Sequence, residues 1–323
     1  YGYLRAMTVP LCDPVSADLI RSELPPERFV RAFRGIEIYS VDGRQAPAVM
    51  EEIGRIREQE FRAEGGGTGR ASDIDEYDTG EPAFRQLVAW DPEAGELIGM
   101  YRYLRAADAR RADGSYALPT ARLFEFSPAF CEEVLPYTIE LGRSVVNRSA
   151  KRAIMGLFCV WAGLGALVVE LPECRYFFGK FTTYPNYHPA ARAALFRFLQ
   201  LYCADPDCLV HPREELRVQA DAEIELPAYA GTDYEADYEL LRIRAAEVGE
   251  AIPPLVISYL ALTRTMRCFG TACNPHFGNV LESAILVPIA DIGTKQRARF
   301  IDSYDSVNPA AITGGDHRVS AEP

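Results

Sequence analysis

The chain has 323 residues, of which 48% are apolar and 25% are charged. That balance is typical of a globular protein and is long enough for one large domain or two small ones. The formal net charge of −12 argues against a nucleic-acid-binding surface, because such a surface needs a basic face.

Charge is unevenly distributed along the chain. Acidic residues are concentrated between positions 205 and 250, whereas residues 102–111 and 143–152 are rich in Arg. The second of these basic segments contains no acidic residue. A local basic region on an acidic protein predicts that an anionic ligand binds at one place.

The first part of the chain is predicted to form an arm, a strand, a helix and a hairpin. Prolines space the irregular residues 1–33, which we expect to form an N-terminal arm. IEIYSV, at 36–41, is typical of a short strand. The helix predicted over 46–63 has Pro47 in its first turn and stops at a run of glycines. Two strands flank a DPEAG turn, at 86–90 and 96–104.

The remaining elements alternate and predict an α/β fold. Strands are expected at 137–146, 175–184, near 266–272 and at 282–290, and helices at 150–170, 189–203 and 253–266. The order predicts an α/β fold with a mostly antiparallel sheet and helices on both faces. We expect a core at 34–204, an acidic insertion at 205–252 that ends in a helix, and a C-terminal extension at 253–323 that completes the sheet.

Residues 153–169 carry no charge and could be a membrane span or a buried helix. A span needs roughly 20 apolar residues, and Gly156, Gly163 and Gly165 weaken this segment as an isolated helix. The sequence holds no second segment of this kind. We therefore predict that this segment is a buried helix and that the protein is cytoplasmic. A peripheral association of the protein with the inner face of the membrane is compatible with this prediction.

The cysteine pattern indicates reduced thiols rather than a metal site. The sequence has eight cysteines and no apparent signal peptide. Cys203 and Cys208 share a C-x4-C spacing with Cys268 and Cys273, but structural zinc sites usually show tighter pairs. No metal is expected, and the sequence assigns no role to Cys268, Cys273 or His276.

Four short motifs occur in a fixed order along the core. They are Arg57 and Phe61 on the first helix; Asp75, Tyr77 and Asp78 after it; Gly99 and Arg102 on a strand; and Glu140 and Arg143 on a later strand. The ordered set resembles the GNAT acyltransferase superfamily over about residues 35–200. More narrowly, it resembles the branch that takes acyl groups from acyl carrier protein.

That branch includes the autoinducer synthases and the ornithine- and glycine-lipid N-acyltransferases, whose relatives are often labelled putative hemolysins. The tail PPLVISYLALTRTMRCFGTACNPHFG looks like the C-terminal part of the lipid-forming enzymes. The tryptophan expected after the first helix in autoinducer synthases is missing, and the chain is longer. These two departures count against a lactone signal as the product.

The resemblance implies catalytic roles for Glu140 and Arg143. Amide formation needs an amine that has lost its proton, and Glu140 could accept that proton directly or through water. On a regular strand the two side chains would face opposite sides. A bulge at Gly142 would bring them to one face and open a slot for the pantetheine arm. The alternative is a carboxylate paired with an arginine for stability.

The resemblance also implies two binding regions. The first is the acceptor side, where opposed charges could orient an amino acid, and a structural ion-pair network explains these charges nearly as well. The residues of this region are Arg57, Phe61, Asp75, Asp78 and Arg102. The turn after strand 137–146 precedes a helix and approximates a phosphate-binding loop, the alternative being a solvated basic turn; its residues are Val145, Arg148, Lys151, Arg152 and Ala153.

The sequence therefore predicts an N-acyltransferase that moves a long acyl or 3-hydroxyacyl chain from acyl carrier protein to the amine of an amino acid, forming a lyso-amino-acid lipid. No tightly bound cofactor is expected, since the donor would be acyl-phosphopantetheine on the carrier protein, or acyl-CoA. Two alternatives stay open. One is a CoA-dependent acetyltransferase acting on a small amine, and the other is a membrane-active or lipid-binding protein without enzymatic activity.

Overall fold

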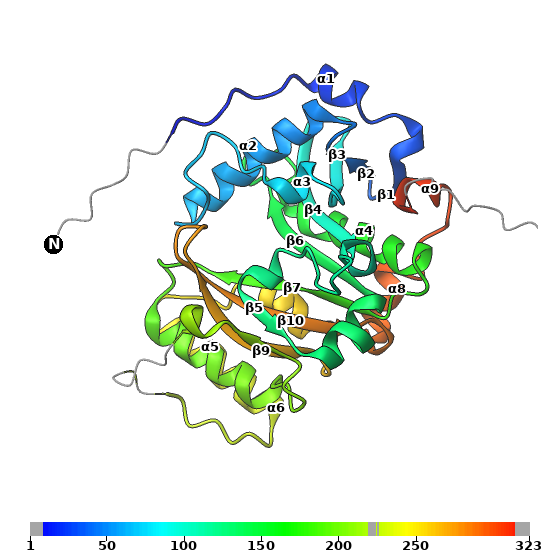
Figure 1. Cartoon of the computed structure of the whole chain (residues 1–323). Coiled ribbons are helices and arrows are strands. Elements are labelled where there is room, and N and C mark those ends of the chain that lie inside the picture. Colours follow the sequence, from blue (N-terminus) through cyan, green and yellow to red (C-terminus); the bar gives the residue numbers. More distant parts are fainter. Residues whose placement is uncertain (1–8, 219–223, 225, 314–323) are drawn as a thin grey trace, which may run out of the picture.

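An eight-stranded sheet forms the centre of the protein, as seen in this computed structural model, which describes residues 9–218, 224 and 226–313 (Figure 1). Its strands lie in the order β1 (Phe29–Phe33), β2 (Ile36–Asp42), β3 (Arg85–Asp91), β4 (Glu96–Arg105), β6 (Thr138–Val146), β7 (Tyr176–Thr183), β10 (Val280–Pro288) and β9 (Arg267–Asn274). A second, two-stranded sheet pairs β5 (Phe124–Phe126) with β8 (Val210–Pro212).

The pairing in the large sheet is antiparallel with one exception. Strands β6 and β7 run parallel, while every other neighbouring pair is antiparallel. Helix α4 (Gly156–Glu170) connects the two parallel strands, as such a pair requires. The mostly antiparallel α/β fold predicted from the sequence is confirmed.

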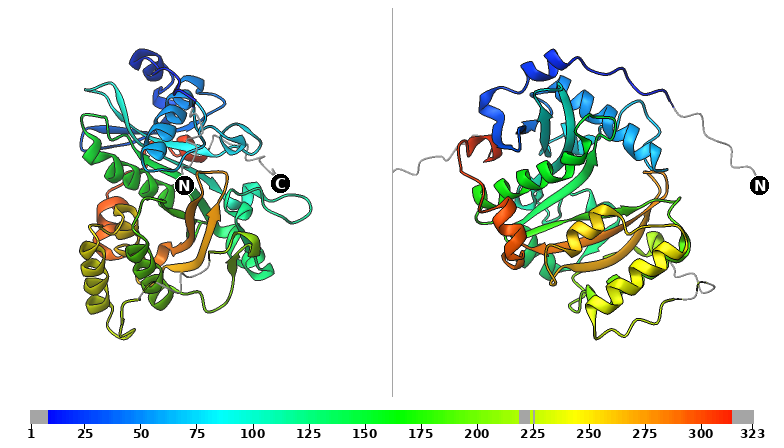
Figure 2. Two further views of the ribbon diagram at one scale, coloured as in Figure 1. Left: turned by 90° about the vertical axis from the view of Figure 1, so that its left-hand side faces the viewer. Right: turned by 180° about the vertical axis from the view of Figure 1, so that it is seen from behind.

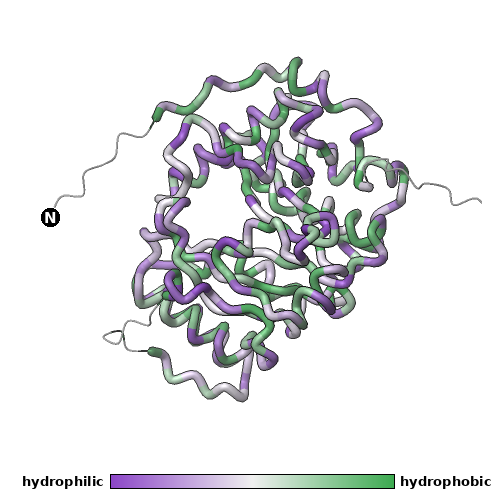
Figure 3. The backbone as a smooth tube through the Cα atoms, viewed as in Figure 1, coloured by the Kyte–Doolittle hydropathy of each residue, from purple (hydrophilic) through white to green (hydrophobic). Residues whose placement is uncertain are grey.

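Helices cover both faces of the sheet (Figure 2). They are α1 (Ala17–Ser22), α2 (Pro47–Ala63), α3 (Glu76–Thr79), α4, α5 (Pro189–Tyr202), α6 (Tyr234–Glu247), α7 (Pro254–Leu260), α8 (Thr294–Phe300) and α9 (Ala310–Thr313). One face packs against α4, α5 and α7 in a single large apolar cluster. The alternation of hydrophobic and hydrophilic positions along α5 is visible in Figure 3.

The opposite face is covered in two parts. Helix α2 packs against β2, β3 and β4 in one apolar cluster. The segment 106–135 packs against β7, β9 and β10 in another, in which the ring of Phe130 contacts Phe178 and Phe269 at centroid distances of 5.1 and 5.9 Å. The two clusters are separate, and the functional site lies where they part.

Helix α4 is the uncharged segment that could have been a membrane span. By length and composition alone, Ala153–Glu170 would pass as one, but more than half of it is buried within the fold. Its start lies so close to β4 that a Cβ on Gly99 would be 2.9 Å from the carbonyl oxygen of Gly156. The glycines that weaken this segment as an isolated helix thus allow close packing on the sheet, as the buried-helix prediction requires.

Several predicted boundaries differ from the structure. The expected N-terminal arm contains α1 and the edge strand β1, whose Arg31 is buried and donates to the carbonyl oxygens of Phe300 and Ser303. The helix expected over 253–266 ends at Leu260, and a local turn follows in which the hydroxyl of Thr263 accepts a hydrogen bond from the Thr265 amide. Helix α4 begins at Gly156, after a 3-10 turn at Ala153–Met155.

The C-terminal part of the chain contributes two strands to the large sheet. Strands β9 and β10 lie beside β7 and form its far edge. The predicted acidic insertion contains β8 and α6, which packs on α5. Residues 219–223 and 225 of that insertion lie outside the described residues, as do 1–8 of the arm and 314–323 of the tail.

Candidate active site

A bulge in the middle of β6 shapes the site. Residues Met100 and Val145 pair across β4 and β6, and so do Arg102 and Gly142, so that one residue of β4 faces two of β6. The extra residue is Arg143, whose φ of 54° lies in the left-handed region. The bulge expected at Gly142 therefore centres one residue later.

Beyond the bulge, β6 and β7 separate. Their parallel pairing runs from Thr138 opposite Tyr176 to Leu141 opposite Gly179, and no further pairs are formed along the described remainder of the two strands. A cavity of about 660 Å³ opens between them, here called the slot. Its walls include Phe61, Ser144, Tyr184 and the beginning of α7.

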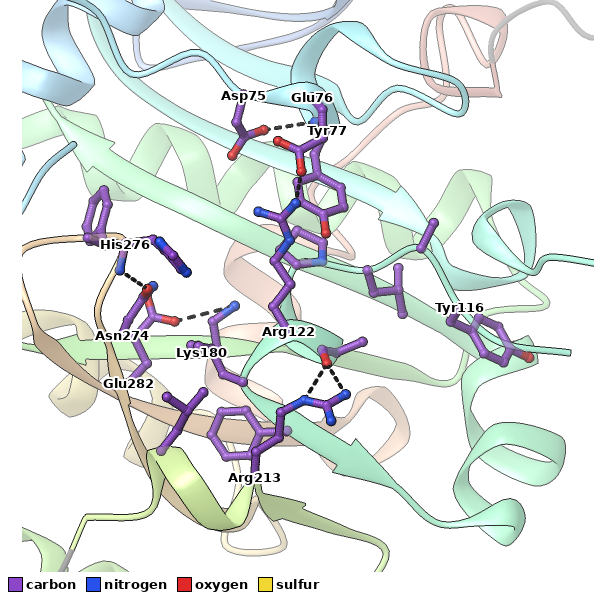
Figure 4. Close-up of a pocket in the computed structure, with 18 of the residues that line it drawn as sticks. Asp75, Glu76, Tyr77, Tyr116, Arg122, Lys180, Arg213, Asn274, His276 and Glu282 are labelled. Carbon is purple, nitrogen blue, oxygen red and sulfur yellow. Dashed lines mark hydrogen bonds and ion pairs between the residues drawn. The ribbon is translucent and has the colours of Figure 1, made fainter. Parts of the chain in front are cut away.

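A second cavity, of about 1640 Å³, lies on the face of the sheet where the two apolar clusters part. Figure 4 shows α3 with Asp75, Glu76 and Tyr77 on one side of this large cavity, and Arg213 on the other. The slot and the large cavity share part of their lining, which shows that they meet; the shared residues are Arg102, Pro119, Arg143, Lys180, Phe277 and Glu282.

Glu140 lines the slot beside this junction and is almost fully buried, with 1% of its surface exposed. One carboxylate oxygen, Oε1, accepts hydrogen bonds from the amide and hydroxyl of Thr120 at 3.1 and 2.6 Å. The other oxygen, Oε2, is buried without a hydrogen-bond partner. Burial raises the pKa of Glu140, and the opposing effects of Lys180, Thr120 and Arg102 do not cancel that rise. A buried carboxylate with a raised pKa accepts a proton more readily than an exposed one, which is what a general base requires.

Arg143 faces the same junction as Glu140, as the sequence predicted for the pair. Its guanidinium lies over the ring of Phe277, 4.2 Å from the centroid, and pairs with Asp73 at 2.8 Å. Phe61 lines the slot and contacts Phe277 edge to face. Arg143 is therefore held in place from two sides, by a carboxylate and by aromatic rings.

Arg57 and Asp78 form a buried ion pair behind the cavities. The two side chains are 0% and 1% exposed and 3.0 Å apart, and neither lines the slot or the large cavity. Asp78 also accepts from Gln86 at 3.0 Å and from Arg102 at 3.3 Å. Of the four charged residues expected on the acceptor side, these two are placed as supports, which agrees with the alternative of a structural network.

Arg102 and Asp75 do reach the cavities. Arg102 lines both of them and pairs with Asp75 at 2.8 Å. Asp75 lines the large cavity and begins α3 through a capping box, in which its side chain accepts from the amide of Tyr77. This pair connects the buried network to the surface where a substrate could bind.

The basic turn after β6 is largely paired with acidic residues of the protein. Arg148 forms ion pairs with Glu60, at 2.5 Å, and with Glu64. Arg152 donates to the carbonyl oxygen of Arg34 and lies 3.7 Å from Asp91.

The other three predicted residues of this turn have different surroundings. The Lys151 amide donates to Glu96, and its side chain is exposed. Val145 is buried in the apolar cluster under α2, and Ala153 begins the 3-10 turn before α4. The turn stands where a phosphate loop was expected, but its role in donor binding stays a prediction.

Metal and thiol chemistry find little support in the part of the chain that the structure describes. There, no group of three or more His, Cys, Asp or Glu side chains could hold a metal ion. All eight cysteines are free thiols, and burial raises the pKa of Cys268 to about 11. His276 lines the large cavity from the turn between β9 and β10 (Figure 4).

Three residues at the junction did not follow from the sequence motifs: Thr120, Lys180 and Glu282. Lys180 and Glu282 lie on neighbouring strands, with Nζ and Oε2 3.6 Å apart. Each is the only charged residue of its strand, among mostly apolar and aromatic neighbours. That pattern is the signal that could have drawn attention to them, because a buried charge is rarely kept without a partner or a function.

Comparison with known proteins agrees with this geometry. The acetyltransferase (GNAT) domain family matches residues 56–161, which include the bulge, Glu140 and most of the paired charges. A glycine N(alpha)-acyltransferase of Phocaeicola vulgatus is 42% identical over 317 residues, or 95% of this chain and 97% of that protein. A glycine N(alpha)-acyltransferase of Bacteroides thetaiotaomicron is 43% identical over 308 residues, or 93% and 91%.

Solved structures of two acyl-homoserine-lactone synthases are similar at a lower level. LasI has a TM-score of 0.39 and 13% identity, covering 82% of this chain and 93% of that one. The CoA-dependent synthase BjaI, with SAM and isopentyl-CoA, has a TM-score of 0.33 and 13% identity, covering 87% and 98%.

Proposed function

This chain belongs to the family of the glycine N(alpha)-acyltransferases, and we propose that it moves a long acyl or 3-hydroxyacyl chain from acyl carrier protein to the amine of glycine. The product is an N-acylglycine, the lyso form of an amino-acid lipid. One observation carries the proposal: Glu140 is buried where the slot meets the large cavity and has one oxygen free to accept a hydrogen bond.

The geometry supports a direct transfer with Glu140 as the base. The pantetheine arm lies in the slot between β6 and β7, and the amine approaches from the large cavity. Glu140 accepts a proton from the amine, whose nitrogen then bonds to the thioester carbon. The carbon–sulfur bond breaks, and the nitrogen, now bonded to the acyl carbon, gives its second proton to the departing thiolate, which becomes a thiol. The first proton leaves Glu140 for solvent, so that an ammonium and a thioester yield an amide, a thiol and one proton.

A donor carried by a protein is supported by the state of the basic turn. CoA brings a pyrophosphate and a ribose phosphate, whereas pantetheine on a carrier protein brings a single phosphate. Arg148 and Arg152 are engaged with Glu60 and Asp91, so a ligand with several phosphates would have to displace these partners. We further propose that the enzyme is cytoplasmic and contacts the inner face of the membrane peripherally, where a long-chain product would partition.

The test is a transfer assay with the purified chain, acyl carrier protein loaded with acyl chains of different length, and a pool of amino acids. The expected product is long-chain N-acylglycine, detected by mass spectrometry. Transfer of acetyl groups from CoA to small amines, without long-chain transfer, would replace the proposal with the small-amine acetyltransferase. Leakage of liposomes without any acyl transfer would replace it with a membrane-active protein.

A variant assigns the chemistry within the same assay. Glu140→Gln should lower turnover by roughly 10²–10⁴, the usual range for a positioned base, and should leave donor binding unchanged. The matched control is Glu173→Gln, because Glu173 is an exposed partner of Arg105 and lines neither cavity. Equal turnover in the two variants would show that Glu140 is not the base.

A further inference from the structure

Lys180 is a mostly buried cation at the point where the slot meets the large cavity. Only 13% of its side chain is exposed, and it lines both cavities. Its ammonium lies 3.2 Å from the hydroxyl of Thr120. It lies 3.6 Å from a carboxylate oxygen of Glu282, and Figure 4 shows this pair. These contacts are either long or neutral, so the lysine has capacity for a further, closer anionic partner.

Two carboxylate oxygens beside Lys180 lack hydrogen-bond donors. They are Oε2 of Glu140 and Oε2 of Glu282, on residues that are 1% and 3% exposed. A buried polar atom without a partner is costly and rare in folded proteins. The group around Lys180 therefore offers both a cation for an anion and unfilled acceptors for N–H donors, which is the complement of a zwitterion.

We propose that Lys180 binds the carboxylate of the acceptor and so makes the enzyme select an α-amino acid over a simple amine. This inference rests on the proposed function. In it, Glu140 Oε2 receives the amino group of the same acceptor molecule. Lys180 is then a specificity-determining residue, and Glu282 is a positioning residue that holds the Lys180 ammonium at the junction.

The spacing of the two binding groups suits an α-amino acid. Thr120 links them, because its hydroxyl donates to Glu140 Oε1 at 2.6 Å and lies 3.2 Å from the Lys180 ammonium. The base and the cation are thus separated by one hydroxyl group. The amine and carboxylate of glycine are separated by one carbon, so a molecule of this size can engage both groups at once.

An acceptor without a carboxylate should bind poorly for a physical reason. It would leave the Lys180 ammonium with the 3.6 Å contact to Glu282 and no closer anion, and sites built to bond a charged group reject analogues that lack it. The parent enzyme should therefore use glycine better than glycinamide by roughly tenfold to a hundredfold in kcat/KM, the equivalent of one charge-assisted hydrogen bond. β-Alanine, with one more carbon, should also be a poor acceptor.

The experiment compares glycine and glycinamide in the parent chain and in Lys180→Met. The variant should raise KM for glycine by about tenfold to a hundredfold and leave kcat within a few-fold. It should change KM for glycinamide little, so that the preference for glycine disappears. Lys180→Arg, which retains the charge, should keep part of that preference.

The outcomes separate the two proposals. If the parent chain acylates no amino acid, the proposed function itself fails. If the parent acylates glycine but uses glycinamide equally well, the inference about Lys180 is overturned, and this measurement needs no variant that folds. Equal losses for both acceptors in Lys180→Met would also overturn it, because a general effect on Glu140 or on folding would not distinguish the acceptors.

Discussion

Asp78→Asn should destabilise the protein strongly without altering acceptor recognition. Asp78 is 1% exposed and receives the guanidinium groups of Arg57 and Arg102 at 3.0 and 3.3 Å. The substitution leaves both buried cations without their shared carboxylate, a change that costs about 3–5 kcal/mol. For a chain of this size we expect the thermal midpoint to fall by roughly 6–12 °C. KM for glycine should stay within about twofold, because Asp78 lines neither cavity.

The pH dependence gives this prediction a second measurement. Burial alone would raise the pKa of Asp78, but Arg57, Arg102 and the Asp75 amide hold it well below its ordinary value. A depressed pKa contributes stability that is present above the unfolded-state value, about 4, and is lost as the pH falls through the folded-state value. The difference in unfolding free energy between parent and Asp78→Asn should therefore be constant above about pH 5 and shrink in more acidic solution.

Asp108→Asn is the matched control for Asp78→Asn, and one outcome would refute the assignment of Asp78 as a structural support. Asp108→Asn removes the partner of Arg105 in an exposed pair, so it should change the free energy of unfolding by about 0.5 kcal/mol or less. If Asp78→Asn instead has the stability of the parent and a much higher KM for the acceptor, then Asp78 contacts the substrate. That result would restore the role first predicted from the sequence and refute the assignment as a support.

Three further predictions concern the base, the bulge and the helix behind the slot. Because the pKa of Glu140 is raised, the pH profile of kcat/KM should have its acidic midpoint above about 4.3, the ordinary pKa of a glutamate, and kcat/KM should fall about tenfold per pH unit below that midpoint. Glu140→Gln should gain stability relative to the parent as the pH rises through that midpoint. A Cβ at Gly142 would lie 3.3 Å from Nε of Arg102 at the wall of the slot. Gly142→Val should therefore raise KM for the acyl donor at least about tenfold and lower the free energy of unfolding by about 1–3 kcal/mol. A greater effect on the KM for glycine would contradict this prediction. A Cβ at Gly165 would lie 1.9 Å from the carbonyl oxygen of Phe300, so Gly165→Ala should lower the denaturation midpoint by an amount equivalent to about 1–3 kcal/mol or more; unchanged unfolding in urea would show that α4 and α8 can move apart freely.

Most of the fold could be predicted because its elements are marked by local signals. Helix α2 has a proline at its start and glycines after its end, and the β3–β4 hairpin has its turn residues. The edge strand β1 was missed because its sequence shows neither turn residues at its ends nor an alternation of apolar and polar residues. Its central residue, Arg31, is buried only because carbonyl oxygens of α8 and the following turn accept its hydrogen bonds. Those contacts span most of the chain, and no local pattern reveals them.

The site was predictable to the extent that its residues lie in ordered motifs. Glu140 and Arg143 do face one junction, and the break in β6 pairing that this needs is present. The position of the bulge was displaced by one residue, because the expectation assumed that glycine would take the unusual backbone conformation. Here Arg143 takes it, and the pair with Asp73 and the stacking on Phe277 offset its cost.

The acceptor-side charges show why sequence alone could not divide supports from binding groups. Arg57 and Arg102 both belong to motifs of the same kind, and only burial and cavity lining distinguish them. Arg57 is enclosed by Asp78 and Gln86, whereas Arg102 reaches the cavities. The difference depends on how α2 and α3 pack together, which is a property of the tertiary structure.

Buried polar atoms without hydrogen-bond partners indicate where a substrate would bind. Two arginines that line the cavities are held by carboxylates, Arg102 by Asp75 and Arg143 by Asp73, although Nε of Arg102 has no hydrogen-bond partner. At the junction, Glu140 and Glu282 each keep a buried carboxylate oxygen without a hydrogen-bond donor. Folding tolerates such atoms when a ligand completes them, because the stability lost in the free protein is recovered on binding. The paired arginines therefore act mainly as a rigid frame, and an amine entering from the large cavity would meet its strongest unfilled acceptor at the carboxylate beside the slot.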